Sequence, residues 1–201
     1  MFVITGTSGA GKGTLVKELL DRVPEVKLAV SATTRELRPG EMDGREYWFL
    51  SHEEFAGRLE QGDFLEHIDF PWGQRSGTLW SELDRISRQG CAPLLELETH
   101  GAVVVRDEVP GSVTIFVKAP TFAELERRLR ERATESAGEI GERLALAREQ
   151  LAQEGEFDYV VVNDDLARAT AELVEIVRRE LDMATMSGRD SSTHRSTARP
   201  R

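Results

Sequence analysis

The chain has 201 residues, with 36 acidic residues against 26 basic ones and a formal net charge of −10. This length fits one compact domain with room for a small insert, and a hydrophobic content of 39% is enough to bury a core. The acidic balance argues against a protein whose main task is to hold duplex nucleic acid, because such a protein needs a basic face for the phosphates. A single cysteine excludes an intramolecular disulfide and any site built from several cysteines.

The sequence carries no signal for a membrane or for export. No apolar run approaches the roughly 18 residues that a bilayer span requires, and Met1 leads directly into an apolar run without the regions of a signal peptide. The lone Cys91 is consistent with a reducing compartment. We therefore expect a cytoplasmic protein with neither a membrane nor a nucleic-acid partner, and its oligomeric state is left open.

Short apolar runs alternate with stretches of helical spacing along most of the chain. Strands that alternate with helices predict an α/β fold, in which a parallel β-sheet is flanked by helices. We expect the core at 1–32 and 79–184, with strands at 2–4, 28–30, 93–97, 113–117 and 159–162 and helices at 11–22, 99–107, 121–132 and 166–181.

Three segments depart from this alternation. Residues 33–78 hold turn signals such as Pro39-Gly40 around short mixed strands, which predicts an inserted subdomain. Residues 136–141 contain two glycines between charged helical stretches, which favours a mobile hinge in a helical lid at about 133–145. Polar residues dominate 185–201, so we expect a disordered, dispensable tail after a domain that ends at 184.

The first glycine-rich stretch has the pattern of a phosphate-binding loop, G-x-x-x-x-G-K, between an expected strand and an expected helix. Glycines let backbone amides curl around a polyphosphate, and Lys12 can reach its β- and γ-phosphates. The strict pattern has Ser or Thr directly after the lysine, so a direct bond from Thr14 to magnesium is in doubt. The alternative is a glycine-rich turn with a solvated lysine. The loop residues are Gly6, Thr7, Ser8, Gly9, Ala10, Gly11, Lys12, Gly13 and Thr14.

A second candidate anion site follows the strand at 28–30. Arg35 and Arg38 stand three residues apart in a polar turn, and Tyr47 follows. Guanidinium groups at this spacing, with a phenol nearby, can grip a phosphate monoester. Taken alone, a solvated arginine pair is the better interpretation.

Together these motifs resemble the guanylate kinase family, and the resemblance runs over 2–181. The matching segments occur in family order: 6–14, 31–41, 44–49, 64–67, 96–101, the arginines after 125, and 157–164. The resemblance implies a P-loop kinase fold with a GMP-binding insert. It also implies direct in-line transfer of the γ-phosphoryl group of ATP to GMP, and to dGMP, with magnesium.

The resemblance assigns roles on the acceptor side. Arg35, Arg38 and Tyr47 would hold the phosphate of GMP, and the residues around the guanine would be Ser31, Glu66, Thr78 and Glu98. The chemistry agrees, since guanine offers two adjacent donors to carboxylates and an O6 acceptor to a hydroxyl. Without the resemblance, Glu66 is equally an exposed strand residue and Glu98 an acid at a helix start.

The resemblance also assigns roles on the donor side. The catalytic residues would be Lys12, Arg35, Arg128, Arg132 and Arg143, the last three acting from the lid on the charge of the transferring phosphoryl group. Composition alone indicates a solvated charged face there. Asn163 would lie near the adenine, or else simply end a strand. No metal site is firm, and Thr14 and Glu96 are the possible ligands.

Two departures from the family pattern keep other interpretations open. Glu96 and Glu98 stand where the family usually has Asp, and Ser76 replaces a second phosphate-binding tyrosine after one extra residue. One donor fewer predicts weaker binding of GMP unless Arg75 supplies it. The alternatives are a same-fold kinase for another phosphorylated small molecule and a non-catalytic guanylate-kinase-like binding module.

Overall fold

The computed structural model describes residues 1–70, 72–132 and 137–193, and in those ranges it describes all side chains except those of 132, 137–139 and 187–193. Five strands form a parallel sheet in the order β2-β7-β1-β8-β9. They are β1 (Phe2–Gly6), β2 (Val26–Leu28), β7 (Ala92–Glu96), β8 (Val113–Lys118) and β9 (Tyr159–Val162). The predicted α/β fold with a helix-flanked parallel sheet is confirmed.

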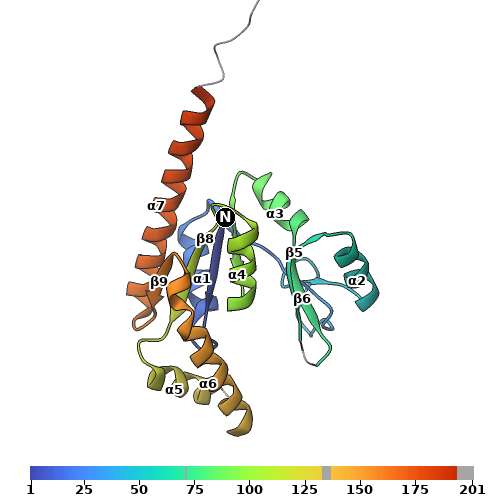
Figure 1. Cartoon of the computed structure of the whole chain (residues 1–201), viewed down its shortest axis with the longest axis vertical. Coiled ribbons are helices and arrows are strands. Elements are labelled where there is room, and N and C mark those ends of the chain that lie inside the picture. The colour runs from blue at the N-terminus through green and yellow to red at the C-terminus, as the bar shows by residue number, and fades with distance from the viewer. Residues whose placement is uncertain (71, 133–136, 194–201) are drawn as a thin grey trace, which may run out of the picture.

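Helices cover both faces of this sheet because successive side chains of β1 point to opposite sides. Ile4 packs in one core cluster with residues of α1 (Lys12–Arg22) and α7 (Leu166–Thr193). Val3 packs in another with residues of α3 (Trp80–Ser87) and α4 (Thr99–Glu108). The central strand β1 is buried along its whole length, so the loop after it starts from a rigid position (Figure 1).

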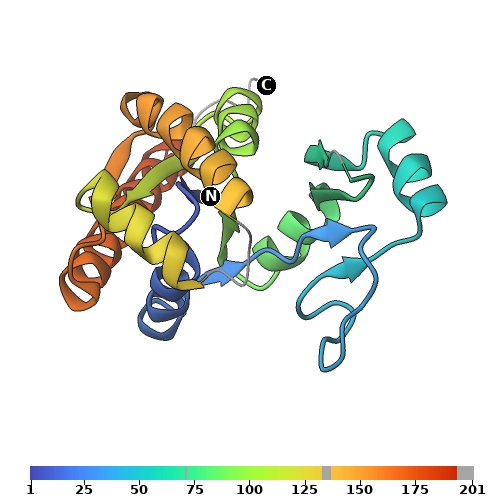
Figure 2. The ribbon, with the colours of Figure 1, turned by 90° about the horizontal axis from the view of Figure 1, so that it is seen from below.

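A second sheet stands beside the first, as Figures 1 and 2 show. Its strand order is β4-β3-β6-β5, and only the β3–β4 pair is parallel. Phe55 and Phe64 stack in its small core at a centroid distance of 4.3 Å. The elements are β3 (Ala32–Thr33), β4 (Trp48–Phe49), α2 (His52–Glu60), β5 (Phe64–Asp69) and β6 (Arg75–Leu79). We call residues 32–79 the insert.

One buried carboxylate ties the insert to the core. Glu82 on α3 is 2% exposed and accepts hydrogen bonds from the Val30 amide (2.9 Å) and the Trp48 indole (3.4 Å). Arg85 donates to both of its oxygens at 2.8 and 2.6 Å. The segment that leads into the insert at Val30, strand β4 of the insert and helix α3 after the insert are therefore all joined through the Glu82 carboxylate.

The lid and the C-terminal end differ from the sequence expectation. Residues 137–141, expected as a hinge, form the first turns of α6 (Ala137–Ala152), while 133–136 lie outside the described residues. Helix α5 (Phe122–Arg132) packs against α6 through an apolar cluster, and η1 (Glu154–Glu156) follows. Helix α7 continues to Thr193, past the helix end expected at 181 and into the segment 185–201 expected to be disordered, because extending an existing helix needs no new nucleus. Residues 194–201 lie outside the description.

Candidate active site

Three glycines give the phosphate-binding loop its shape. Gly6, Gly9 and Gly11 have φ values of 136°, 85° and 89°, which is the region that side chains disfavour. A Cβ atom on Gly6 would lie 1.9 Å from the Val117 carbonyl oxygen, and one on Gly11 would lie 2.5 Å from Nδ2 of Asn163. The Val117 backbone therefore leaves no room for a side chain at position 6, and at position 11 a side chain would strain the backbone and displace the Asn163 amide.

Lys12 bends back over this loop. Its Nζ donates hydrogen bonds to the carbonyl oxygens of Gly6 (2.7 Å) and Thr7 (3.3 Å). Burial lowers the pKa of the ammonium group, and the negative charges of Glu98 and Glu96 oppose that shift. An anion bound in the loop would stabilise this partly desolvated charge, which is the electrostatic condition of a phosphate site.

Asn163 braces the loop from behind. Its Nδ2 donates to the Ala10 carbonyl at 2.7 Å, and its backbone carbonyl accepts from Arg128 at 3.0 Å. The side chain is 7% exposed, so it is a structural link between the loop, the end of β9 and helix α5. Its strand-ending position could be anticipated from the sequence, whereas this contact with the loop could not.

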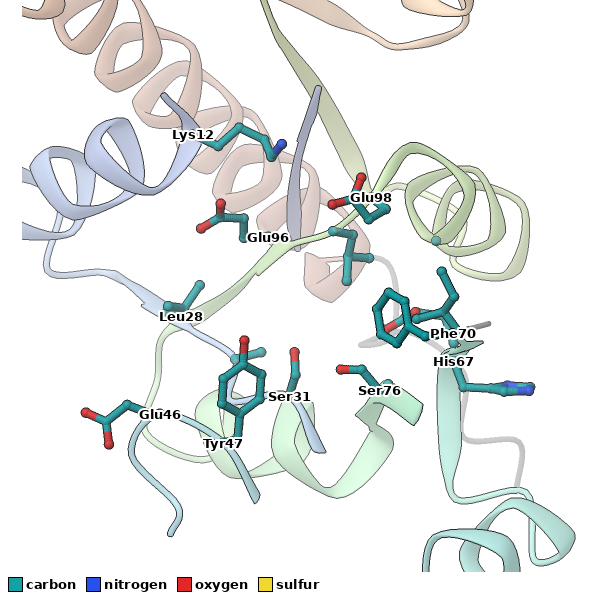
Figure 3. Close-up of a pocket in the computed structure, with 16 residues that line it drawn as sticks. Lys12, Leu28, Ser31, Glu46, Tyr47, His67, Phe70, Ser76, Glu96 and Glu98 are labelled. Carbon is teal, nitrogen blue, oxygen red and sulfur yellow. The ribbon is translucent and has the colours of Figure 1, made fainter. Parts of the chain in front are cut away.

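A pocket of about 350 Å³ lies between the loop and the insert (Figure 3). In Figure 3 the hydroxyl group of Tyr47 and the side chains of Ser31 and Ser76 point into it from the insert side, while Lys12 and Glu98 face it from the core. Residues that the sequence analysis assigned to ATP and residues that it assigned to GMP thus line the same pocket. The sequence-predicted residues in its lining are Lys12, Ser31, Tyr47, Glu66, Glu96 and Glu98.

Glu66 is a buried carboxyl on the wall of this pocket, with 7% exposure. Burial raises its pKa, and the hydrogen bond from the Thr78 hydroxyl, at 2.8 Å from Oε1, opposes the shift. Glu66 and Thr78 are cross-strand partners on β5 and β6, which explains their contact. The Thr78 hydroxyl, which the sequence assigned to the guanine, therefore donates to Glu66, and Thr78 is not among the residues that line the pocket. The other oxygen lies against Gly101, where a Cβ would be 3.1 Å away.

Glu96 and Glu98 line the core side of the pocket. Glu96 is the last residue of β7. Desolvation by the surrounding protein raises the pKa of its carboxyl group, the negative charge of Glu98 raises it further, and the positive charge of Lys12 lowers it. Glu98 is the N-cap residue of α4 and accepts a hydrogen bond from Gln150 Nε2 at 3.1 Å. Within the described residues no group of three or more His, Cys, Asp or Glu side chains could hold a metal ion. A divalent cation here would need most of its oxygen ligands from a bound nucleotide and water.

The arginine pair lies outside this pocket, in a hollow of about 520 Å³ that it lines with Thr34, His52 and Gln74 among others. Glu41 binds Arg35 through both carboxylate oxygens, at 3.0 Å from Nη1 and 2.8 Å from Nη2. It also accepts from the Arg38 amide at 2.9 Å. The Arg35 guanidinium lies 5.2 Å from the centre of the Tyr47 ring, and Tyr47 lines the pocket. The tyrosine therefore connects the hollow to the pocket.

Arg75 does not replace the missing tyrosine. Ser76 lines the pocket and donates to the Ala32 carbonyl at 3.0 Å. Its neighbour on the strand points to the opposite face, where the Arg75 guanidinium pairs with Asp69 at 3.1 Å and lies 6.0 Å from the centre of the Phe55 ring. The suggestion that Arg75 supplies the lost donor is wrong for this structure.

The lid arginines have different settings. Arg128 is half-buried, and besides Asn163 it binds Glu124 at 2.7 Å. The hydrogen bonds from Arg127 and Arg128 lower the pKa of Glu124 to about 2. Arg143 is exposed on α6, and the Arg132 side chain lies outside the description. Arg127 and Arg130 pair with glutamates on their own helix, as expected of a solvated face.

Sequence reasoning missed three side chains that hold the site together: Glu41, Glu82 and Gln150. For Gln150 a signal existed, because it follows Leu144 and Ala147 at helical spacing on the buried face of α6. An amide at an apolar position is unusual and needs a partner. For Glu41 and Glu82 the partners lie on other elements or across a turn, and spacing alone does not reveal them.

Comparison with known proteins places this site in a family. The family model described as guanylate kinase matches residues 1–180. The guanylate kinase of Rubrobacter xylanophilus is 46% identical over 183 residues, covering 89% of this chain and 93% of that protein. That of Prochlorococcus marinus is 47% identical over 175 residues, covering 87% and 92%.

The fold agrees with these sequence matches. The crystal structure of the guanylate kinase from Anaplasma phagocytophilum superposes with a TM-score of 0.70 at 28% identity, covering 90% of this chain and 85% of that one. Among the described residues no helix is long and apolar enough to cross a membrane. The phosphate loop, the acidic pocket beside it and the family match over nearly the whole domain lead to one conclusion: the chain belongs to the guanylate kinase family.

Proposed function

We propose that this protein transfers the γ-phosphoryl group of ATP to GMP, and to dGMP, with the help of magnesium. One observation carries the proposal: Lys12 of the phosphate loop and the carboxylates Glu66 and Glu98 line the same pocket. The phosphate loop suits the polyphosphate of ATP, and the carboxylate pair suits guanine. Because both line one pocket, the γ-phosphate of ATP and the phosphate of GMP can approach each other there.

On the donor side, the loop holds the ATP phosphates through its backbone amides and Lys12. The glycine backbone conformations and the close packing of the loop on β8 fix its shape, so little reorganisation is needed at the moment of transfer. Arg128 reaches the loop region through Asn163, and with Arg132 and Arg143 it would meet the charge of the transferring group. Asn163 would lie behind the adenine-binding end of the loop.

On the acceptor side, Glu66 and Glu98 accept hydrogen bonds from N1 and the 2-amino group of guanine. Thr78 fixes the Glu66 carboxylate from within the sheet, which leaves its second oxygen for the base. Ser31 lies on the opposite wall. Adenine lacks the N1 proton, so this carboxylate pair discriminates against AMP.

The acceptor phosphate is held by Tyr47, Arg35 and Arg38. Glu41 occupies the Nη1–Nη2 edge of Arg35, and among the described residues no group accepts a hydrogen bond from its Nε. The Nε edge thus remains for a phosphate oxygen. Because the arginines line a hollow next to the pocket, the insert must close toward the core to bring them to the acceptor.

The chemistry needs no covalent intermediate. A phosphate oxygen of GMP attacks the γ-phosphorus in line, the bond to the β-γ bridging oxygen breaks, and ADP leaves. The acceptor phosphate is already ionised near neutral pH, so positioning and charge stabilisation supply most of the rate. Bound magnesium would neutralise part of the phosphate charge, and Thr14 and Glu96 are the residues that would hold it, directly or through water.

The experiment is a coupled assay of ADP release with ATP and each of GMP, dGMP, AMP, CMP, UMP and ribose 5-phosphate. We expect GMP to be the best acceptor, and activity to require magnesium. A better rate with another phosphorylated acceptor would make the chain a same-fold kinase of different specificity. No transfer to any acceptor, with nucleotide binding intact, would identify a non-catalytic module.

A further inference from the structure

Gln150 is a buried amide that reaches the pocket wall from the lid side. It lies near the end of α6 and is 3% exposed. Its Nε2 donates to Glu98 Oε2 at 3.1 Å, and its Oε1 has no hydrogen-bond donor among the described protein groups. The contact spans 52 positions in the sequence and joins α6 to the start of α4.

The orientation of this amide follows from chemistry. An ionised carboxylate only accepts hydrogen bonds, so the amide nitrogen must face Glu98 and the amide oxygen must face the interior. A buried oxygen without a donor lowers stability. Leu144 and Ala147, on the same face of α6, are apolar. Packing alone would therefore favour an apolar residue at 150, and the amide is explained by what it does to Glu98.

Glu98 needs such a partner. It caps α4 without a side-chain capping bond, and Gln150 is the one residue in the described parts of the chain that hydrogen-bonds its carboxylate. The bond engages Oε2 and leaves Oε1 for a ligand. Because the carboxylate of a glutamate can rotate freely at a pocket edge, this single bond decides where its open oxygen points.

We propose that Gln150 is a positioning residue for the acceptor base, which acts by orienting Glu98. The inference rests on the proposed function, in which Glu98 accepts from guanine. It adds a link between the two halves of the site, because the same helix carries Arg143 in its first half and Gln150 near its end.

The test is Gln150→Met, which keeps the side-chain length and removes both polar groups. We expect the GMP Michaelis constant to rise about 3- to 10-fold, in line with the loss of orientation of one charge-assisted hydrogen bond. The ATP constant should stay within about twofold. The melting temperature should be unchanged or higher, because the unpartnered oxygen is gone. Gln153→Met is the control, since that amide lies in the turn after α6 and, among the described residues, the hydrogen bond to Glu98 comes from Gln150.

A double-mutant cycle separates positioning from a structural role. In a Glu98→Ala background, Gln150→Met should add nothing to the rise in the GMP constant. Equal effects in both backgrounds, or an unchanged GMP constant in Gln150→Met and in a second variant Gln150→Leu, would overturn the inference while the proposed function stands. A wild-type protein that does not use GMP would overturn both.

Discussion

The donor and acceptor halves of the site are built by different means. The phosphate loop follows a fully buried strand and is fixed by glycine conformations and by backbone contacts to Val117 and Asn163. The insert has a core of a few residues around Phe55 and Phe64. Arg35, the arginine proposed to bind the acceptor phosphate, is held by the Glu41 carboxylate and by the Glu36 carbonyl. The proposed donor half is therefore fixed by the backbone, whereas the proposed acceptor half depends on individual side-chain contacts and, in the function we propose, closes toward the core.

The largest expected effect comes from Lys12→Ala, which removes the lysine of the phosphate loop. We expect turnover to fall by at least about 10²- to 10³-fold, the loss typical of one group aimed at developing charge. The fold should persist because, in the part of the chain that the structure describes, the Lys12 ammonium group hydrogen-bonds to carbonyls of its own loop. Steady-state kinetics with circular dichroism measure both. Turnover within about threefold of wild type would refute the role of the loop.

Glu82→Ala tests the joint between the halves. Removing this carboxylate leaves the Val30 amide and Arg85 without their acceptor, so the free energy of unfolding should fall by about 1 to 3 kcal/mol. The GMP constant should rise more than the ATP constant, since the insert loses its tie to the core. Asp84→Ala, an exposed acid on the same helix, is the control in urea titrations and should change little.

Ser76→Tyr restores a donor to the acceptor half. A phenol at this pocket-lining position should lower the GMP constant by at least about 10-fold, the lower end of the effect of one charge-assisted hydrogen bond. Arg75→Ala should leave the constant within about twofold, because its guanidinium points to the other face of the sheet. A large effect of Arg75→Ala would show that this strand changes register or twist when GMP binds.

Glu41→Ala should affect the acceptor phosphate only. Without its bidentate partner, Arg35 loses its fixed orientation, and we expect the GMP constant to rise about 3- to 10-fold with the ATP constant unchanged. Glu36→Ala is the matched control, because Arg35 binds the backbone carbonyl of Glu36 and not its carboxylate. If both variants behave alike, the ion pair does not orient Arg35.

The smallest effect is a pH dependence of stability from Glu66. Burial raises its pKa above the ordinary 4.5. The protonated form is thus favoured in the folded state, and the stability it contributes below pH 4.5 is lost as the pH rises through the folded pKa. Glu66→Gln has no such loss, so its melting temperature relative to wild type should increase between about pH 4 and pH 7. A constant difference across that range would contradict the assignment.

The main sheet and the loop could be predicted from the sequence because their determinants are local. Strands buried on both faces appear as continuous apolar runs, as at 113–117, and the loop motif lies between a strand and a helix. The boundary of α7 could not, since helix ends depend on propagation as well as composition. The strand expected at 28–30 lies at Val26–Leu28. It ends at Leu28 because residues 29–31 already lead into the insert.

The candidate site was predictable as a set of residues but not as an arrangement. The direction of Arg75 follows from strand register, which pairs it with Asp69. The capture of Arg35 by Glu41 and the bond from Gln150 to Glu98 join groups whose spacing carries no pattern. Tertiary contacts of this kind appear only when the chain is folded, and they decide which motif residues share a pocket.

The movement of the acceptor half can be measured directly. Spin labels on exposed positions of the two halves, Lys17 on α1 and Glu60 on α2, in a Cys91→Ala background, report the distance between core and insert by pulsed electron resonance. Addition of GMP with a non-hydrolysable ATP analogue should shorten this distance by several ångströms and narrow its distribution. An unchanged distance in an enzyme that still phosphorylates GMP would show that the insert is already in place and that the account of closure is wrong.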